Sequence, residues 1–303
     1  MNNYSMLNPK IFMSFMVLEG LSAIDNLTNS FKKMIALQLL VIFTFVFYCN
    51  GAPSLRISEN SAENIARLSN LRPGDLAEEL SGQFEGDMIL TEEQYAEINR
   101  KNGMLAEKYR WPSNTLVYEI EEGWYDNEQI DYIHQAMRII EHATCLQFKQ
   151  RDALSDSSYI SIHGDSTGCS ATVGHNGESQ HVKLKPYPVG SGCFRLGTIV
   201  HELIHAIGFR HMQNTYNRDD YVEIMWENIE PGKEKNFYLY GPDKVDNFGE
   251  EYDYGSIMHY SEKSFSMNGE KTIVVRQETD QKIGQRDGMS KSDILKINRM
   301  YGC

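Results

Sequence analysis

The strongest pattern of apolar residues in the chain lies between residues 196 and 207. Apolar side chains recur there at the spacing of one helix face, and they are Leu196, Ile199, Val200, Leu203, Ile204 and Ile207. This spacing predicts a helix with one buried side. Gly208 follows at the position where a left-handed residue commonly ends a helix, so we expect the chain to turn there.

Other stretches predict a mixture of helices and strands. Apolar residues at roughly helical spacing predict a helix from Asn127 to Phe148 and a shorter amphipathic helix at 290–301. Residues 115–120 are of types that favour strands, while 159–162 and 181–184 alternate between apolar and polar side chains. We expect the last of these strands to form an edge along a cleft, where it could pair with an extended substrate.

An apolar run at 35–48 follows Lys32 and Lys33 and ends near small residues. A basic region, an apolar region and small residues in this order are typical of a secretory signal. The run is shorter than the roughly 20 residues that span a bilayer, which argues against a stable membrane anchor. We interpret residues 1–52 as a leader with a signal peptide, with Met34 as the hypothetical true start, and we expect a secreted, extracellular protein.

The stretch 53–101 is polar and acidic, contains no cysteine and has no long periodic apolar run. We interpret it as a propeptide. It ends in Arg100 and Lys101, a basic pair at which a trypsin-like protease could cut. A solvated pair in a loop is the alternative interpretation. The remaining residues, 102–303, are expected to form one catalytic domain.

The predicted helix at 196–207 carries the motif H-E-x-x-H at 201–205. His201 and His205 share a helix face, so both imidazoles can point at one ion, and Glu202 can reach a water on that ion. His211 is ten residues past His201, roughly 15 Å along a straight helix, so the chain must turn back for all three to meet. Three imidazoles plus an open position are typical of a catalytic zinc site. An amphipathic core helix with satisfied histidines is the alternative.

Further motifs accompany the zinc pattern. Downstream, residues 256–260 have the form S-x-M-H-Y. Four further short motifs belong to the same pattern, at 217–222, 226–229, 168–170 and 173–174. Together with the extended zinc motif, they resemble the astacin family of zinc endopeptidases over roughly residues 102–303. The resemblance implies an α+β catalytic domain of two subdomains. A twisted sheet with helices would lie above the cleft, and a mostly irregular C-terminal subdomain would lie below it.

The resemblance also implies roles for residues of the site. His201, His205 and His211 would bind one zinc ion per chain, and Glu202 would be the general base for the attacking water. Tyr260 would be a further zinc ligand that swings away to stabilise the oxyanion. Met258 would be the structural residue of a Met-turn, packed beneath the histidines.

The chain has five cysteines, one of which, Cys49, lies in the predicted leader. The other four are an even number and are consistent with two disulfides, for which the sequence allows three pairings. The resemblance implies the pairs Cys145–Cys303 and Cys169–Cys193. A zinc site built from these thiols is the alternative, but their spacing lacks a C-x₂-C pair.

Within 53–101, the run Phe84-Glu85-Gly86-Asp87 resembles the F-x-G-D motif of astacin propeptides. The resemblance implies that Asp87 occupies the open position on zinc and holds the enzyme inactive, which suits a carboxylate because it is a good zinc ligand. Taken alone, Asp after Gly is usually just a turn. The resemblance also implies that the mature chain begins at Asn102, after cleavage by a trypsin-like protease.

The sequence departs from the family pattern directly after the third zinc histidine. Astacins usually carry Glu there, and it engages the N-terminus formed by activation, whereas this chain has Met212, which cannot bind an ammonium. Thr215 and Asn217 replace the usual Arg and Asp. Either another acid holds the new N-terminus, or activation leaves this terminus less ordered.

Three other features bear on function. Residues 164–168 fit the G-x-S-x-G motif of serine hydrolases with Ser166 as nucleophile, but no helical pattern follows them. A catalytically idle binding protein on the same scaffold is a further alternative, although Glu202 and the zinc ligands are all present. The net charge of −13 argues against a nucleic-acid partner.

The expected partners are therefore a protein or peptide substrate and the activating protease, and we expect a monomer. Arg286 lies near the C-terminal wall of the cleft by analogy with the family. It could favour acidic residues just after the cut, but an ordinary surface arginine is the preferred interpretation.

Overall fold

The computed structural model describes residues 77–99, 107–242 and 245–303, all of which lie within a single unit spanning residues 58–303. The predicted leader at 1–52 and the predicted cut site at Arg100 and Lys101 lie outside the described residues. Within the described part, no helix is both long and apolar enough to cross a membrane.

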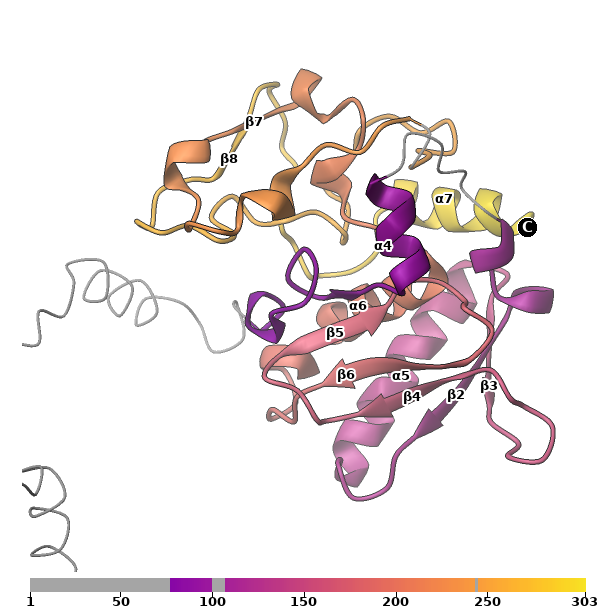
Figure 1. Cartoon of the computed structure of the whole chain (residues 1–303). Coiled ribbons are helices and arrows are strands. Elements are labelled where there is room, and N and C mark those ends of the chain that lie inside the picture. The colour runs from indigo at the N-terminus through magenta and orange to yellow at the C-terminus, as the bar shows by residue number, and fades with distance from the viewer. Residues whose placement is uncertain (1–76, 100–106, 243–244) are drawn as a thin grey trace, which may run out of the picture. The chain divides into compact units, whose positions relative to one another are not determined.

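A six-stranded sheet is the framework of the first half of the domain (Figure 1). Its order is β1-β5-β6-β4-β2-β3. The strands are β1 (Met88–Ile89), β2 (Thr115–Ile120), β3 (Gln147–Gln150), β4 (Tyr159–His163), β5 (Cys169–Thr172) and β6 (Ser179–Leu184). β5 and β6 are antiparallel, and the other neighbouring strands are parallel. The reversed strand β5 therefore lies between the rest of the sheet and β1.

The strand predicted at 181–184 exists, but the prediction that it forms an edge is wrong. β6 has β5 on one side and β4 on the other. Its alternation reflects one buried face, with Val182 and Leu184 fully buried, and this pattern does not distinguish an edge strand from an inner one. β5 takes the place expected of β6, and residues 88 and 89 pair with it.

The α helices of the described part are α4 (Glu92–Asn99), α5 (Asn127–Ala143), α6 (Leu196–Ile207) and α7 (Lys291–Tyr301). α5 and α6 pack against each other, and α6 also contacts β5 and β6 (Figure 1). The main core fills the space between these helices and the sheet, and includes Ile133, Ile140, Ile162, Val182 and Leu203. Hydrophobic burial between these two layers therefore fixes α6 beneath the sheet edge.

Side-chain caps define where two of the helices begin. At α5, Asp126 accepts a hydrogen bond from the backbone N–H of Gln129, whose side chain accepts one in return. At α7, Ser290 and Asp293 make the same reciprocal pair. Each pair satisfies two backbone donors that a bare helix end would leave unpaired.

The second half, from Met212 onwards, contains little regular structure. β7 (Val222–Ile224) and β8 (Ile273–Val275) form a two-stranded antiparallel sheet. A separate core beneath it includes Val222, Phe237, Phe265 and Ile273. Short 3₁₀ helices occur throughout the described chain, at Glu79–Ser81, Glu107–Tyr109, Pro112–Asn114, Gly192–Phe194, Met212–Asn214, Arg218–Asp220, Trp226–Asn228 and Glu234–Phe237. The predicted α+β class is confirmed.

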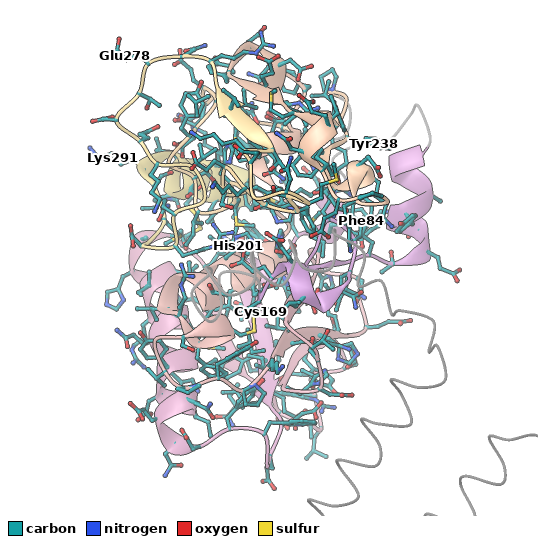
Figure 2. All side chains as sticks on the ribbon, turned by 90° about the vertical axis from the view of Figure 1, so that its left-hand side faces the viewer. Phe84, Cys169, His201, Tyr238, Glu278 and Lys291 are labelled. Atoms are coloured by element: carbon teal, nitrogen blue, oxygen red, sulfur yellow. A yellow bond between two sulfur atoms is a disulfide. The ribbon has the colours of Figure 1, made fainter. Side chains whose placement is uncertain are left out.

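Two disulfides stabilise the ends of these elements. Cys169 of β5 is bonded to Cys193, just before α6 (Figure 2). Cys145, after α5, is bonded to Cys303, after α7. These are the two pairs that the family resemblance implies. The second closes a long loop, since its cysteines are 158 positions apart.

Residues 77–99, called here the N-terminal segment, contact both halves of the domain. The carbonyls of Asp87 and Ile89 accept hydrogen bonds from Ala171 (2.8 Å) and Val173 (3.1 Å) at the sheet edge. On the other side, the Glu79 carboxylate accepts a hydrogen bond from the backbone N–H of Phe265 (3.1 Å). The segment thus places Asp87 between the zinc-motif helix and the C-terminal half.

Candidate active site

The zinc motif lies on the buried helix α6 and on the turn that follows it. Figure 2 marks His201. His201 and His205 are fully buried, and their ring centroids are 4.6 Å apart. The helix ends at Gly208, whose φ of 125° is a conformation that residues with side chains rarely adopt. The turn brings the ring of His211 to 5.4 Å from that of His201 and to 4.7 Å from that of His205. The predicted turn at Gly208 is confirmed.

Asp87 of the N-terminal segment completes the cluster. Its Oδ2 lies 3.2 Å from His201 Nε2, and its Oδ1 lies 3.4 Å from His205 Nε2 and 3.2 Å from His211 Nε2. The four ligand atoms all lie within 4.8 Å of one another. Two ligands that are each about 2.05 Å from a tetrahedral ion are roughly 3.3 Å apart. The spacing therefore suits one zinc ion with three nitrogen ligands and one oxygen ligand.

The hydrogen bonds around the cluster leave the ligand atoms available. The Nδ1 atoms of the three histidines all face oxygens at hydrogen-bond distance, with pairs His201–Ile257 O (2.9 Å), His205–Phe209 O (2.7 Å) and His211–Glu85 Oε2 (3.0 Å). A proton on Nδ1 leaves the Nε2 lone pair free, which is the tautomer that a metal requires. In the described part of the chain, Nε2 of His205 and of His211 and Oδ1 of Asp87 are buried without a hydrogen-bond partner. A metal ion would satisfy all three atoms.

Glu202 follows the first histidine on α6 and is fully buried. Neither of its carboxylate oxygens has a hydrogen-bond partner among the described residues. Burial raises the pKa of Glu202 well above its usual range, and the nearby charge of Asp87 raises it further. A carboxylate with a raised pKa is a stronger proton acceptor than an ordinary Glu, which suits a general base.

The Met-turn lies directly beside the histidines. The carbonyl of Met258 accepts a hydrogen bond from the backbone N–H of Met212 (3.0 Å). The side chain of Met258 is buried in the main core. Tyr260 lies two residues further, with its ring centroid 4.6 Å from that of His211. Its hydroxyl donates a hydrogen bond to the backbone carbonyl of Glu85. The N-terminal segment therefore engages the tyrosine as well as the zinc histidines.

A comparison with known protein families decides the identity of the domain. The model of the Astacin family of peptidases matches residues 103–302. The chain belongs to the astacin family. It is a zinc metalloendopeptidase that acts on protein substrates, and its three histidines bind the zinc. The predictions of the enzyme class and of zinc as the cofactor are confirmed.

Individual astacins resemble this chain over most of its length. Seminal metalloprotease 1 of Drosophila melanogaster is 38% identical over 226 residues, which are 74% of this chain and 88% of that protein. Meprin A subunit beta of Homo sapiens is 39% identical over 221 residues, which are 73% of this chain and 30% of that protein. Among solved structures, High choriolytic enzyme 1, a hatching enzyme zinc-protease of Oryzias latipes, matches with a TM-score of 0.58 at 36% identity. This match covers 64% of the present chain and 93% of the other.

Glu85 and Tyr240 are site residues of this astacin that the sequence did not reveal. The Glu85 carboxylate accepts a hydrogen bond from the Tyr240 hydroxyl and lies 3.0 Å from His211 Nδ1. Burial raises the pKa of Tyr240 well above its usual range, and Glu85 adds to this effect, so the hydroxyl stays a donor. Glu85 occupies the variable position of the F-x-G-D motif, and the motif therefore carries no signal for it.

The Arg286 side chain of this astacin is buried against the N-terminal segment, so its interpretation as a surface arginine is wrong. Its side chain is 6% exposed, and it donates two parallel hydrogen bonds to the Glu78 carboxylate, at 2.9 and 2.6 Å. Burial alone would raise the pKa of Glu78, but the guanidinium outweighs this effect and lowers the pKa to about 2. The partners are 208 positions apart, so the sequence around Arg286 gives no sign of this burial.

Ser166 lacks the surroundings of a hydrolase nucleophile. It lies in the loop between the strands β4 and β5, and its hydroxyl accepts a hydrogen bond from the backbone N–H of Gly168 (3.2 Å). The serine-hydrolase elbow requires a strand followed by a sharp turn and a helix. The element after Gly168 is the strand β5, so the motif is a loop in this astacin.

Proposed function

We propose that this chain is made as a secreted zymogen and becomes an active endopeptidase when the N-terminal segment is released. The observation that carries the proposal is the position of Asp87. Its carboxylate oxygens lie 3.2–3.4 Å from the Nε2 atoms of all three zinc histidines, the spacing of ligands that share one ion. Two disulfides are typical of proteins that fold in an oxidising compartment, and they support export. Within this proposal, residues 53–101 are the propeptide and 102–303 are the monomeric enzyme.

In the mature enzyme, Glu202 acts as the general base and then as the general acid. When bound, zinc supplies a Lewis acid that polarises the scissile carbonyl and acidifies water. Glu202 takes a proton from the attacking water and delivers it to the leaving amine. The raised pKa of its buried carboxyl supports this role, because the carboxyl can hold the proton between the two steps.

Tyr260 stabilises the negative charge that develops on the substrate carbonyl. Its hydroxyl lies near the zinc histidines and donates to the carbonyl of Glu85 while the segment is in place. Once the segment leaves, this donor is available to a substrate oxygen, or as a further zinc ligand in the resting enzyme. Met258 supports the histidines from below.

The segment is held by a second anchor besides Asp87. Glu78 pairs with Arg286 and also accepts a hydrogen bond from the Thr198 hydroxyl (3.2 Å). Nearby, the carbonyl of Ala77 accepts a hydrogen bond from the backbone N–H of Cys169 (2.9 Å). The segment therefore covers both the zinc histidines and Arg286.

Arg286 then recognises an acidic residue of the substrate after activation. Release of Glu78 would leave the guanidinium without its carboxylate partner and open to the substrate, and it favours a carboxylate because bidentate pairing is strong. This supports the alternative in which an acidic residue is preferred next to the cut.

Limited digestion of the full chain with trypsin tests the proposed function. The intact chain should have little peptidase activity, and the digested chain should be active and sensitive to a zinc chelator. N-terminal sequencing should place the cut after Lys101. Full activity in the intact chain would overturn the zymogen proposal. Absence of activity after the correct cut would favour the catalytically idle alternative.

A further inference from the structure

Lys296 of α7 carries an ammonium that is buried behind the zinc site. The residue is 5% exposed, and its Nζ lies 3.2 Å from the Met212 sulfur. A thioether is a weak acceptor, so this contact replaces little of the water that an ammonium loses on burial. Burial accordingly lowers the pKa of Lys296, while three carboxylates, those of Asp293, Asp253 and Glu250, oppose the effect.

Two of these carboxylates are themselves buried and closely linked. Asp293 is 5% exposed and Asp253 is 6% exposed. Ser290 connects them, because its backbone N–H donates to Asp293 (2.9 Å) and its hydroxyl donates to Asp253. Glu250 is paired with Arg299 at 2.7 Å. Lys296 is therefore a buried cation whose charge is balanced chiefly by the buried aspartate pair.

The groups around Lys296 are connected to two zinc histidines, one through hydrogen bonds and the other through the backbone. Asp293 accepts a hydrogen bond from the backbone N–H of Ile257 (2.9 Å), and the carbonyl of Ile257 faces His201 Nδ1 (2.9 Å). On the other route, Met212 directly follows His211, and its backbone N–H donates to the carbonyl of Met258. Loss of the ammonium is therefore expected to shift both the Met-turn and the third zinc histidine.

We propose that Lys296 is a positioning residue whose buried ammonium, in contact with the Met212 sulfur, fixes α7 against the Met-turn and the loop of the third zinc histidine. The inference rests on the zinc site and the maturation of the proposed function. This cation belongs to the chain before any cut. The site therefore does not require the ammonium of a newly formed N-terminus, which Met212 could not bind.

The first experiment changes only the new N-terminus. Gly-Ser is inserted between Lys101 and Asn102 of the full chain, so that trypsin leaves two extra residues on the mature enzyme. The kcat, the KM and the rate of zinc loss to a chelator should equal those of the normal enzyme. A fall in kcat of about tenfold, with faster zinc loss, would show that the site depends on its terminal ammonium and would overturn the proposal.

The second experiment removes the ammonium. Lys296→Met keeps a long apolar side chain, and Lys291→Met, at an exposed position of the same helix, is the matched control. Lys296→Met should lower kcat more than it changes KM and should speed zinc loss by about tenfold or more, whereas the control should change neither. A lower melting temperature with unchanged kcat and zinc loss would make Lys296 merely structural and would overturn the proposal.

These readouts separate the inference from the proposed function. Zinc loss can be measured without any peptidase activity, so it reports on Lys296 even in a Glu202→Gln background. If Lys296→Met fails to fold, the insertion at the N-terminus can still overturn the proposal, because it replaces no residue of the domain.

Discussion

Asp87 Oδ2 lies 3.2 Å from His201 Nε2, although the two residues are 114 positions apart in the chain. Burial by itself would raise the pKa of Asp87, but His211 and His205 outweigh it and hold the pKa well below its usual range. The carboxylate is thus charged and directed at the zinc ligands. This contact, together with the Glu78–Arg286 pair, holds the N-terminal segment over the site.

Replacing Asp87 by Ala should activate the full chain without proteolysis. The substitution removes the oxygen at the fourth ligand position, so the peptidase activity of the uncut chain should rise by about tenfold or more, the effect of at least about 1.4 kcal/mol of lost inhibition. Activity is measured on a quenched fluorescent peptide. Glu92→Gln, at an exposed position of the same segment, is the control and should leave the chain inactive. An inactive, zinc-loaded Asp87→Ala chain would contradict the assignment.

Replacing Glu78 by Gln should weaken the hold of the segment without touching the zinc ligands. We expect the free energy that holds the segment on the domain to fall by about 1–3 kcal/mol. Breaking a fully buried ion pair costs about 3–5 kcal/mol, and the loss is smaller here because Glu78 keeps partial exposure. The uncut variant should show measurable activity, and trypsin should activate it faster.

Gly168→Ala provides an independent check of how the N-terminal segment is held, through its contact with Ala77. A methyl group at Gly168 would lie 2.0 Å from the carbonyl oxygen of Ala77, and the backbone at Gly168 is not in the left-handed region. The uncut Gly168→Ala chain should resemble Glu78→Gln, while the digested enzyme should keep normal activity. No gain of activity in the uncut variant, together with reduced activity after digestion, would show that Gly168 matters to the enzyme and not to the segment.

The Glu78–Arg286 pair should make a pH-dependent contribution to stability. Glu78 has a folded-state pKa of about 2, lowered from 4.5. A lowered carboxyl pKa stabilises the folded chain above the unfolded pKa, and the stabilisation is lost as the pH falls through the folded pKa. The difference in melting temperature between the full chain and Glu78→Gln should be constant above about pH 5 and shrink towards pH 2. A difference that grows on acidification would refute this origin.

Replacing Tyr260 by Phe should impair turnover but not zinc binding. Loss of one donor to the developing oxyanion typically lowers kcat by about 10²–10³-fold. The variant keeps the ring that packs against His211, so zinc content and KM should stay near those of the normal enzyme. Steady-state kinetics of the trypsin-digested protein, with zinc measured by mass spectrometry, would check both. Unchanged kcat would remove Tyr260 from the proposed mechanism.

The sequence predicted the local features of this site well. The helix expected at 196–207 is α6, the turn at Gly208 has the positive φ that only glycine adopts easily, and the three histidines meet. Strand β2 spans the expected residues 115–120. These features follow from side-chain periodicity and from the steric freedom of one glycine. Both are determined by residues that are close together in the sequence.

Contacts between distant parts of the chain were not predictable in the same way. The burial of Arg286 depends on Glu78, and the hydrogen bonds of Glu85 depend on Tyr240. The neighbours of β6 are set by the reversed direction of β5, which alternation does not encode. Periodicity shows which face of an element is buried but not which partner buries it.

The most direct test of the account is Glu202→Gln in the trypsin-digested protein. The three histidines should still bind one zinc ion per chain, so zinc content and melting temperature should match those of the normal enzyme. Peptidase activity should fall to less than about 1%, because the general base contributes about 10²–10⁴-fold. Turnover that stays unchanged with zinc bound would contradict the assignment of Glu202 and with it the proposed mechanism.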